Sequence, residues 1–260
     1  MRQVSLLLLT AVLMCAQDGQ QESRPGWPCV SGRAVDPAYI ETSESTGGQV
    51  FLFQKDEIAQ STPALMASTT HPATILRAIG QVAGAREFQF NVDSTVESML
   101  VLASLQCRKD VTVFRPNGQE MASHNSSQAT DLKTGKILRV DFPEPGVWKL
   151  RISGSGLFVF SVMAKTSVRM PALRLPDARL GVRQDVDVNV SREISDVKWQ
   201  LVTEAGDPAS EAQPAEALDA GGFRVVITPA IERFRVRMLA TDANGRPLER
   251  ISPVLFRAKP

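Results

Sequence analysis

Side chains that commonly do chemistry are few in this sequence. It has two histidines, His71 beside a proline and His124 in a turn-rich stretch. Neither has a histidine, cysteine or carboxylate partner at the spacing of metal ligands. The sequence also has no nucleophile-elbow, zinc-protease, phosphate-loop or dinucleotide-binding motif. We therefore expect no catalytic residue, no metal and no cofactor, and we interpret the chain as non-enzymatic.

Two stretches rich in side-chain oxygens, residues 115–118 and 241–245, could suggest calcium. A calcium loop needs several oxygen ligands at regular offsets, whereas each stretch has at most two before its glycine. We interpret both as hairpin turns. Residues 154–156 (GSG) are also predicted to form a hairpin turn, because the residues on either side alternate like strands and no helix follows.

Trp148 and Trp199 each lie in a strand-like run, where a tryptophan could stack on a sugar or fill a core. Alternate residues of a strand point to the same side, which places Trp148 with Leu150 and Trp199 with Val197, both apolar. Core filling is therefore favoured over sugar binding.

The first residues have the pattern of a secretory signal peptide. Arg2 precedes an uncharged apolar run that is too short to span a bilayer as a stable helix. We interpret residues 1–16 as a signal peptide and residues 17–35 as a linker, which predicts a secreted, periplasmic or extracellular protein. Lipid anchoring at Cys15 is the less favoured alternative, because Met14 is large for the position before an acylated cysteine.

Cys29 and Cys107 are the two cysteines that would remain after cleavage. An even pair in an exported chain predicts a disulfide, with two free thiols as the alternative. Asn125 and Asn189 fit the acceptor pattern for N-glycosylation, which has meaning only in a eukaryotic secretory pathway.

The charges are nearly balanced, with 29 lysines and arginines against 28 aspartates and glutamates. This balance gives no indication of binding to nucleic acid or to an anionic membrane. With 43% apolar residues, 260 residues can build one large core or two ordinary ones.

The elements that would position these residues begin with a helix–strand–helix segment over residues 36–70. Asp36 can cap the first helix, a proline follows at its first position, and Gly47 can end it. The apolar run at residues 49–53 predicts a buried strand. Residues 55–70 predict a second helix that its proline kinks or divides.

From residue 71 onward the hydrophobic pattern has a period of two. Seven strand-length runs with turn residues between them predict an antiparallel, jelly-roll-like sandwich over residues 71–167. A second series predicts a smaller immunoglobulin-like sandwich over residues 168–260, with residues 204–222 as a loop. In this series Arg233, Arg235 and Arg237 alternate with apolar residues, so we expect them to face solvent. The fold class is mainly β.

Several stretches resemble the hemicentins and related extracellular proteins. Residues 38–51 (AYIETSESTGGQVF) resemble the closing helix and strand of a von Willebrand factor A domain. Residues 90–121, 137–164 and 234–258 resemble the segment that follows this domain in hemicentins, which implies a galactose-binding-like sandwich. The portion PEPGVWKLRISGSGLFVFSV is also similar to jelly-roll-like domains attached to secreted bacterial peptidases.

The chain departs from this family where the A domain would bind a metal. That site begins Asp-x-Ser-x-Ser, and the nearest string, at Asp93, lacks the serine at the third position. The residues before Tyr39 are also too few for an α/β domain. The resemblance therefore implies that residues 36–70 are the C-terminal remnant of an A domain, without its divalent-cation chemistry. We expect Val50, Leu52 and the next helix to cover an edge or end of the first sandwich.

Together these features predict an exported binding or structural protein that mediates extracellular protein–protein interaction or adhesion. The alternatives are a carbohydrate-binding module, or an accessory sandwich region like those of secreted peptidases. The expected partner is a protein or glycan outside the cytoplasm. We expect no nucleic acid partner and no membrane span.

Overall fold

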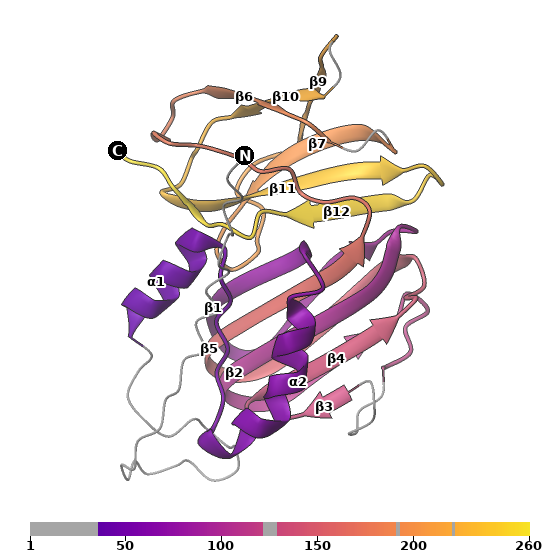
Figure 1. Ribbon diagram of the computed structural model, residues 1–260. Coiled ribbons are helices and arrows are strands. Elements are labelled where there is room, and N and C mark those ends of the chain that lie inside the picture. The colour runs from indigo at the N-terminus through magenta and orange to yellow at the C-terminus, as the bar shows by residue number, and fades with distance from the viewer. Residues whose placement is uncertain (1–35, 122–128, 191–192, 220–221) are drawn as a thin grey trace, which may run out of the picture.

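The computed structural model of the protein describes residues 36–121, 129–190, 193–219 and 222–260. The signal peptide and linker predicted for residues 1–35 lie outside the described residues. The described chain forms two β units stacked on each other, with two helices beside the first unit (Figure 1). The fold is mainly β, as the sequence predicts.

Helix α1 (Pro37–Thr46) begins and ends where the sequence predicts. The Asp36 carboxylate caps it by accepting a hydrogen bond of 2.9 Å from a first-turn N–H, and Gly47 ends it with a left-handed φ of 74°. After a connection, the 3-10 turn η1 (Lys55–Glu57) leads directly into helix α2 (Ile58–Ser68). Helix α2 is continuous, so its proline does not divide it.

The apolar run at residues 49–53 does not form the strand that the sequence predicts. Side chains of the first β unit, and not a neighbouring strand, pair with the backbone at Leu52 in the middle of this run. The Leu52 N–H donates to Ser104 Oγ at 3.1 Å, and Thr134 Oγ1 donates to the Leu52 carbonyl at 2.8 Å. The N-terminal segment is therefore two helices joined by an anchored, irregular connection.

The first β unit is one antiparallel sheet in the order β1-β5-β2-β4-β3. The prediction of seven short strands is wrong, because three pairs of runs merge into single strands of 20, 19 and 21 residues. The strands are β1 (Ala73–Val92), β2 (Val96–Phe114), β3 (Ala129–Asp131), β4 (Gly135–Asp141) and β5 (Gly146–Thr166).

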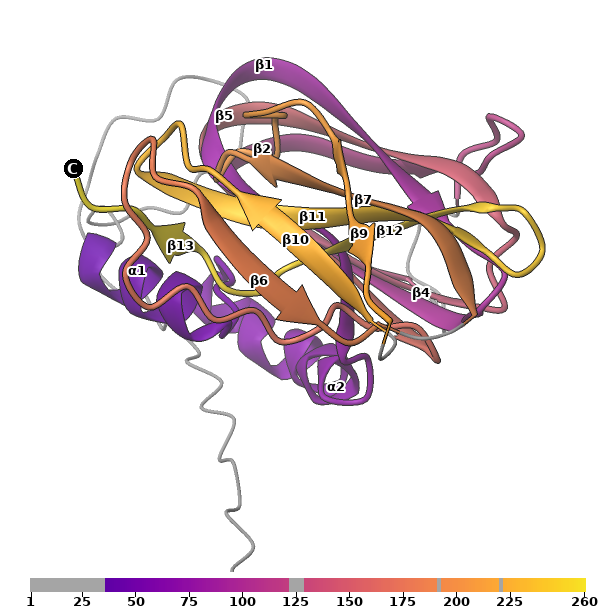
Figure 2. The ribbon, with the colours of Figure 1, turned by 90° about the horizontal axis from the view of Figure 1, so that it is seen from above.

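The turn predicted at residues 154–156 lies in the middle of β5 and does not reverse the chain. Gly154 lies opposite Gly84 of β1, and their φ angles are 155° and 110°. A Cβ on Gly154 would lie 2.1 Å from the Cys107 carbonyl oxygen of β2, which is closer than any side chain permits. These glycines bend the paired strands, and β1 arches strongly in Figure 2.

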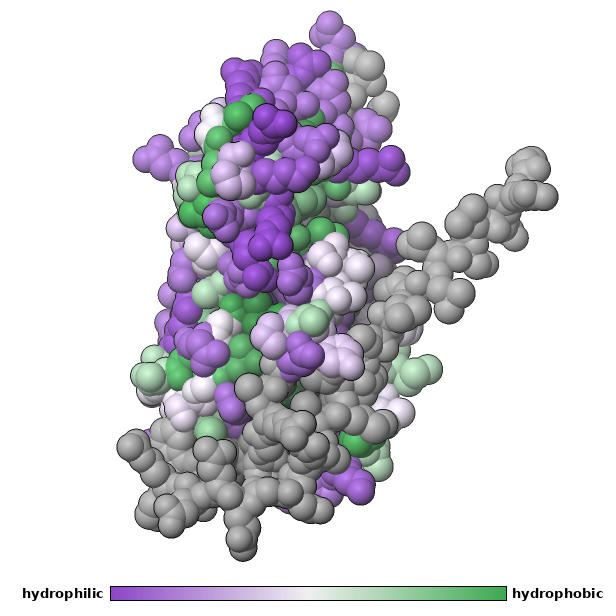
Figure 3. Space-filling view, turned by 90° about the vertical axis from the view of Figure 1, so that its left-hand side faces the viewer, coloured by the Kyte–Doolittle hydropathy of each residue, from purple (hydrophilic) through white to green (hydrophobic). Residues whose placement is uncertain are grey.

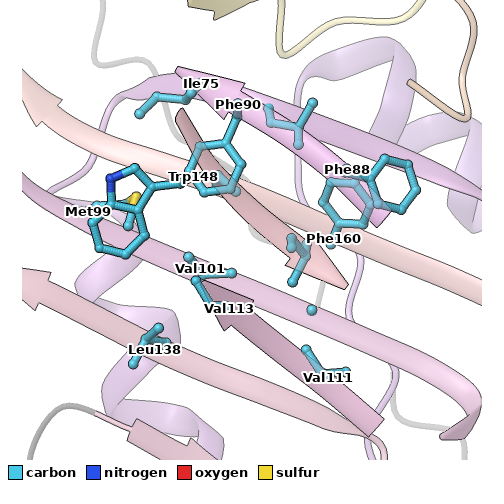
Figure 4. Packing of buried hydrophobic residues seen from close by; sticks show 14 of the residues in the cluster. Ile75, Phe88, Phe90, Met99, Val101, Val111, Val113, Leu138, Trp148 and Phe160 are labelled. Carbon is cyan, nitrogen blue, oxygen red and sulfur yellow. The ribbon is translucent and has the colours of Figure 1, made fainter. Parts of the chain in front are cut away.

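Side chains of one phase along the bent strands meet in a single core (Figure 4). Phe88 and Phe90 come from the second half of β1, Trp148 from the start of β5, and Phe160 from beyond the β5 glycines. Phe88 and Phe160 pack edge to face at 4.5 Å between ring centroids. The sheet therefore folds over onto itself, and its two halves supply the layers of the predicted sandwich.

The outer face of this sheet is covered by the apolar run of the N-terminal segment. Phe51 and Phe53 stack at 5.8 Å between ring centroids, and both pack on Leu100 and Leu102 of β2. Val50 packs against other residues of β1 and β5. The run covers a face of the first sandwich, which corrects the expectation that it covers an edge or end.

The second β unit is also a sandwich. One sheet has the order β6-β10-β9, and the other has the order β12-β11-β7-β8, with β13 paired to β11. The bounds are β6 (Gln184–Val188), β7 (Ile194–Val202), β8 (Gln213–Pro214), β9 (Glu216–Ala217), β10 (Phe223–Ile227), β11 (Arg233–Asp242), β12 (Pro247–Ile251) and β13 (Phe256–Arg257). Phe234, Val236 and Met238 of β11 are fully buried in its core, as their alternation predicts.

The arginines of β11 do not all face solvent, and this expectation is wrong. Arg235 is completely buried and forms an ion pair with Glu44 of α1, which also pairs with Arg77 of β1. Burial lowers the pKa of Arg77 to about 10 and that of Arg235 to about 9. The outward face of β11 therefore packs against the helix and the first sandwich.

A second polar contact joins the two sandwiches along β1 and β12. The Glu249 carboxylate of β12 accepts hydrogen bonds of 3.3 Å from the backbone and side chain of Asn91 and pairs with Arg237 at 3.1 Å. Burial raises the pKa of Glu249 against the opposing effect of Arg237.

Among the described residues, no helix has the length and apolarity needed to cross a bilayer.

Candidate functional site

The two tryptophans considered for sugar binding are buried. Trp148 is 0% exposed, and its indole N–H donates to the Glu144 carbonyl at 2.9 Å. Trp199 is 3% exposed in the core of the second sandwich. Neither ring is available to stack on a sugar, so the core interpretation is confirmed.

His71 has a structural environment. It is 2% exposed, with its Nε2 2.9 Å from Ser98 Oγ and its Nδ1 3.1 Å from Thr70 Oγ1. His124 lies outside the described residues. Within the described ranges, no group of three or more histidines, cysteines or carboxylates is arranged to hold a metal ion.

The two oxygen-rich stretches form turns. The Gly118 N–H donates to the Arg115 carbonyl at 2.9 Å, and the Gly245 N–H donates to the Asp242 carbonyl at 3.0 Å. The Asp242 carboxylate accepts hydrogen bonds from Ser94 and from two backbone N–H groups of its own turn. Protein donors therefore occupy the oxygens that a cation would need.

The predicted disulfide is not tested, because Cys29 lies outside the described residues. Cys107 lies partly exposed on β2, beside two irregularities in its pairing with β5. Of the glycosylation acceptors, Asn189 is exposed and Asn125 lies outside the described residues. The pairing and the glycosylation stay predictions.

The most unusual surface residue is one that the sequence reasoning missed. Phe142, in the loop between β4 and β5, is 84% exposed and has a φ of 50°. A bulky residue in the left-handed region is a true outlier, because its Cβ is crowded by the backbone. Water contact with nearly the whole ring adds an unfavourable hydrophobic term. Strained, exposed side chains of this kind cluster at functional sites.

The loop around Phe142 is held firmly. The Phe142 N–H donates to the Glu97 carbonyl at 2.8 Å, and the Trp148 indole holds the Glu144 carbonyl. Gly146 lies so close to Pro116 that an added Cβ would come within 2.8 Å of it. The exposed ring is therefore presented by a fixed backbone, which lowers the entropy lost on binding a partner.

Exposed charges of both signs flank this loop. Arg139 and Asp141 of β4 pair at 3.0 Å, and Lys165 of β5 pairs with Glu97 of β2 at 2.6 Å. Just beyond the loop, Val147 at the start of β5 is 45% exposed. Hydrophilic residues predominate over the second sandwich on the side shown in Figure 3.

The sequence pattern itself explains why Phe142 was missed. It continues the phase of Leu138 and Val140, which point into the core, so period-two counting makes it the last inward residue of its strand. The strand instead ends at Asp141, and the positive φ at Phe142 turns the ring outward. The phenylalanine directly before PEPG is the only sequence signal for this site.

The fold of the first sandwich belongs to the galactose-binding-like class of β-sandwich domains. Residues 73–167 match the family described as "Hemicentin galactose-binding domain-like". This range contains β1 to β5 and agrees with the resemblance that the sequence suggested. The match does not include residues 36–70, for which the A-domain resemblance is not shown.

Similarity to solved structures is weak. The chain is similar to a Bacillus licheniformis lipase, BlEst2, in its propeptide form, at 16% identity and a TM-score of 0.40, with 70% of this chain and 40% of that chain covered. It is also similar to the Endo-D glycoside hydrolase domain Spr0440 from Streptococcus pneumoniae R6, at 11% identity and a TM-score of 0.23, with 69% and 32% covered. The chain thus spans less than half of either structure. No curated protein matches it.

Proposed function

We propose that this chain is an exported, non-enzymatic binding protein whose first sandwich contacts a partner protein outside the cytoplasm through Phe142. The observation that carries the proposal is the conformation of Phe142, which combines a left-handed backbone with an 84% exposed ring. Both features disfavour phenylalanine in the free protein. A partner that buries the ring would remove the cost of exposing it to water.

The surroundings of Phe142 favour a protein partner. An aromatic anchor on a rigid loop with charged residues at its rim has the arrangement of a binding hot spot. The two ion pairs of this rim, Arg139 with Asp141 and Lys165 with Glu97, are largely exposed and contribute little to stability. They can instead orient a partner of complementary charge pattern.

Glycan binding is the second candidate, and the galactose-binding-like match of residues 73–167 favours it. With Trp148 and Trp199 buried, Phe142 is an exposed ring of the first sandwich on which a sugar could stack. We further propose that residues 1–16 direct export. We also propose that residues 36–70 derive from an A domain.

The test compares the wild type with Phe142→Asn, because asparagine tolerates a positive φ and removes the ring. Proteins retained from the native extracellular fraction are quantified by mass spectrometry, and a glycan array is probed in parallel. The matched control is Val182→Asn, which removes a 48% exposed apolar side chain from the second sandwich.

We expect Phe142→Asn to lose specific protein partners that Val182→Asn retains. Its stability should be equal to that of the wild type or higher by up to about 1 kcal/mol, since backbone strain is relieved. Loss of glycan signal alone would establish the second candidate. Identical partners for all three proteins would refute a binding role for this loop.

A further inference from the structure

The second sandwich contains a cavity of about 480 Å³ that the proposed function does not use. It opens between the two sheets, where β8 lies at the edge of one sheet and β10 belongs to the other. Trp199 and Val236 form part of its apolar wall, and Gln213 and Val226 lie at its two sides. A cavity of this size is in the range of binding pockets.

The wall of this cavity contains a buried donor without an acceptor. The Trp199 indole N–H has no hydrogen-bond partner among the described residues, although the side chain is 97% buried. In the first sandwich the Trp148 indole is satisfied by the Glu144 carbonyl. The Trp199 nitrogen is itself enclosed by protein, so Trp199 lines the cavity with its apolar ring and offers no donor to a ligand there.

The side of the cavity formed by β10 is an incomplete strand edge. The Leu218 N–H donates to the Gly222 carbonyl at 3.1 Å. Hydrogen-bonded and non-hydrogen-bonded pairs alternate along antiparallel strands, so the next pair, Phe223 and Ala217, is non-hydrogen-bonded. Backbone groups alternate in direction along a strand, and those of Arg224 and Val226 therefore point toward β9.

Strand β9 is only two residues long and does not reach Val226. Its last pairing with β10 is between Glu216 and Arg224. Within the described residues, Val226 pairs only with Asp185 of β6, on the opposite side. The N–H and C=O of Val226 therefore face the cavity mouth without a strand beside them, and such an edge can accept an added strand.

We propose that this cleft binds an extended peptide segment of a partner protein, which adds to the free edge of β10. The peptide backbone pairs with Val226, and one peptide side chain enters the cavity and packs on the ring of Trp199. A peptide satisfies both features, because a strand supplies donors and acceptors for the edge and alternate side chains for the cavity.

The test uses a displayed library of seven-residue peptides, selected on the exported protein and measured individually by titration. The diagnostic variant is Val226→Pro, which removes the edge N–H but no hydrogen bond to β6, so the sandwich should still fold. The matched control is Val226→Thr, which keeps the N–H. Binding is followed by the chemical shift of the Trp199 indole proton, assigned with Trp199→Phe.

We expect selected peptides to shift the Trp199 signal and to bind Val226→Pro at least about tenfold more weakly than the wild type and Val226→Thr. Phe142→Asn should bind them normally, which separates this site from the proposed contact in the first sandwich. Equal binding to Val226→Pro and the wild type would overturn the proposal. So would a small molecule that shifts the Trp199 signal while no peptide does.

Discussion

Arg250 and Asp93 form an ion pair of 2.8 Å whose two side chains are completely enclosed between the sandwiches. Arg250 lies on β12, and Asp93 lies in the hairpin between β1 and β2. Arg250 also donates to the Val168 carbonyl at 2.8 Å and to Thr166 Oγ1 at 3.2 Å. The pair therefore joins the two units at the point where the chain passes from one to the other.

Removing one partner of this pair should be costly. We expect Arg250→Met to lower the free energy of unfolding by about 3–5 kcal/mol, because the Asp93 charge stays buried without its partner. The double variant Asp93→Asn with Arg250→Met should recover much of the loss. Equilibrium urea unfolding measures both. A single variant that loses less than about 1 kcal/mol would show that the pair contributes little.

The acid sensitivity of the protein should depend on Asp242. Burial disfavours its charge, but hydrogen bonds from Ser94, Arg246 and Asn244 outweigh this and lower its pKa below the usual 3.8. A lowered folded pKa gives stability that is present above the unfolded pKa and lost as the pH falls through the folded value.

The variant Asp242→Asn should therefore be less stable than the wild type at neutral pH, by about 1–3 kcal/mol. The difference should shrink as the pH falls below 3.8 and through the lowered folded pKa, because the wild-type carboxylate then becomes protonated. Urea unfolding across this pH range tests the sign. The matched control is Asp177→Asn, whose carboxylate is exposed in a distant ion pair. A difference that does not change with pH would contradict the prediction.

The N-terminal segment should be an integral part of the first sandwich. Phe51→Ala and Phe53→Ala each remove a buried ring from the outer face of the sheet, and each should cost about 3–5 kcal/mol. Tyr39→Ala, which removes a 55% exposed ring from α1, should have little effect. Thermal unfolding is the measurement. Unchanged melting of both phenylalanine variants would mean that the segment is dispensable.

The predicted disulfide between Cys29 and Cys107 has a direct test. In the exported protein we expect a cross-linked peptide that contains both cysteines, because an oxidising compartment favours pairing. Mass spectrometry of unreduced digests detects it. Recovery of both cysteines with free thiols would refute the pairing and would leave residues 17–35 without this connection to β2.

Features that depend only on residues close together in the sequence were predictable. Asp36 and Gly47 set the bounds of α1. Asp36 accepts a hydrogen bond from a first-turn N–H, and Gly47 adopts the left-handed conformation that ends a helix. The burial of Phe234 and Trp148 was predictable because every second residue of a sandwich strand faces the core.

Features that depend on distant residues were not predictable. Arg235 has the sequence pattern of a surface arginine, and only the packing of α1 against β11 brings Glu44 to it. Gly154 resembles a turn residue until β1 and β2 are seen on both sides of it. Phe142 keeps the phase of its strand, and only the observed φ shows that the strand has ended. In each case tertiary contacts outweigh the local pattern.

The strand order of the first sheet determines when this sheet can form during synthesis. Strand β5 lies between β1 and β2, yet it is the last of the five strands to be made. Until Thr166 has left the ribosome, β1 and β2 lack their common neighbour, and each has long hydrophobic edges open to other chains. A nascent chain paused before β5 therefore leaves these edges open to aggregation, and a chaperone would be expected to protect them at that stage.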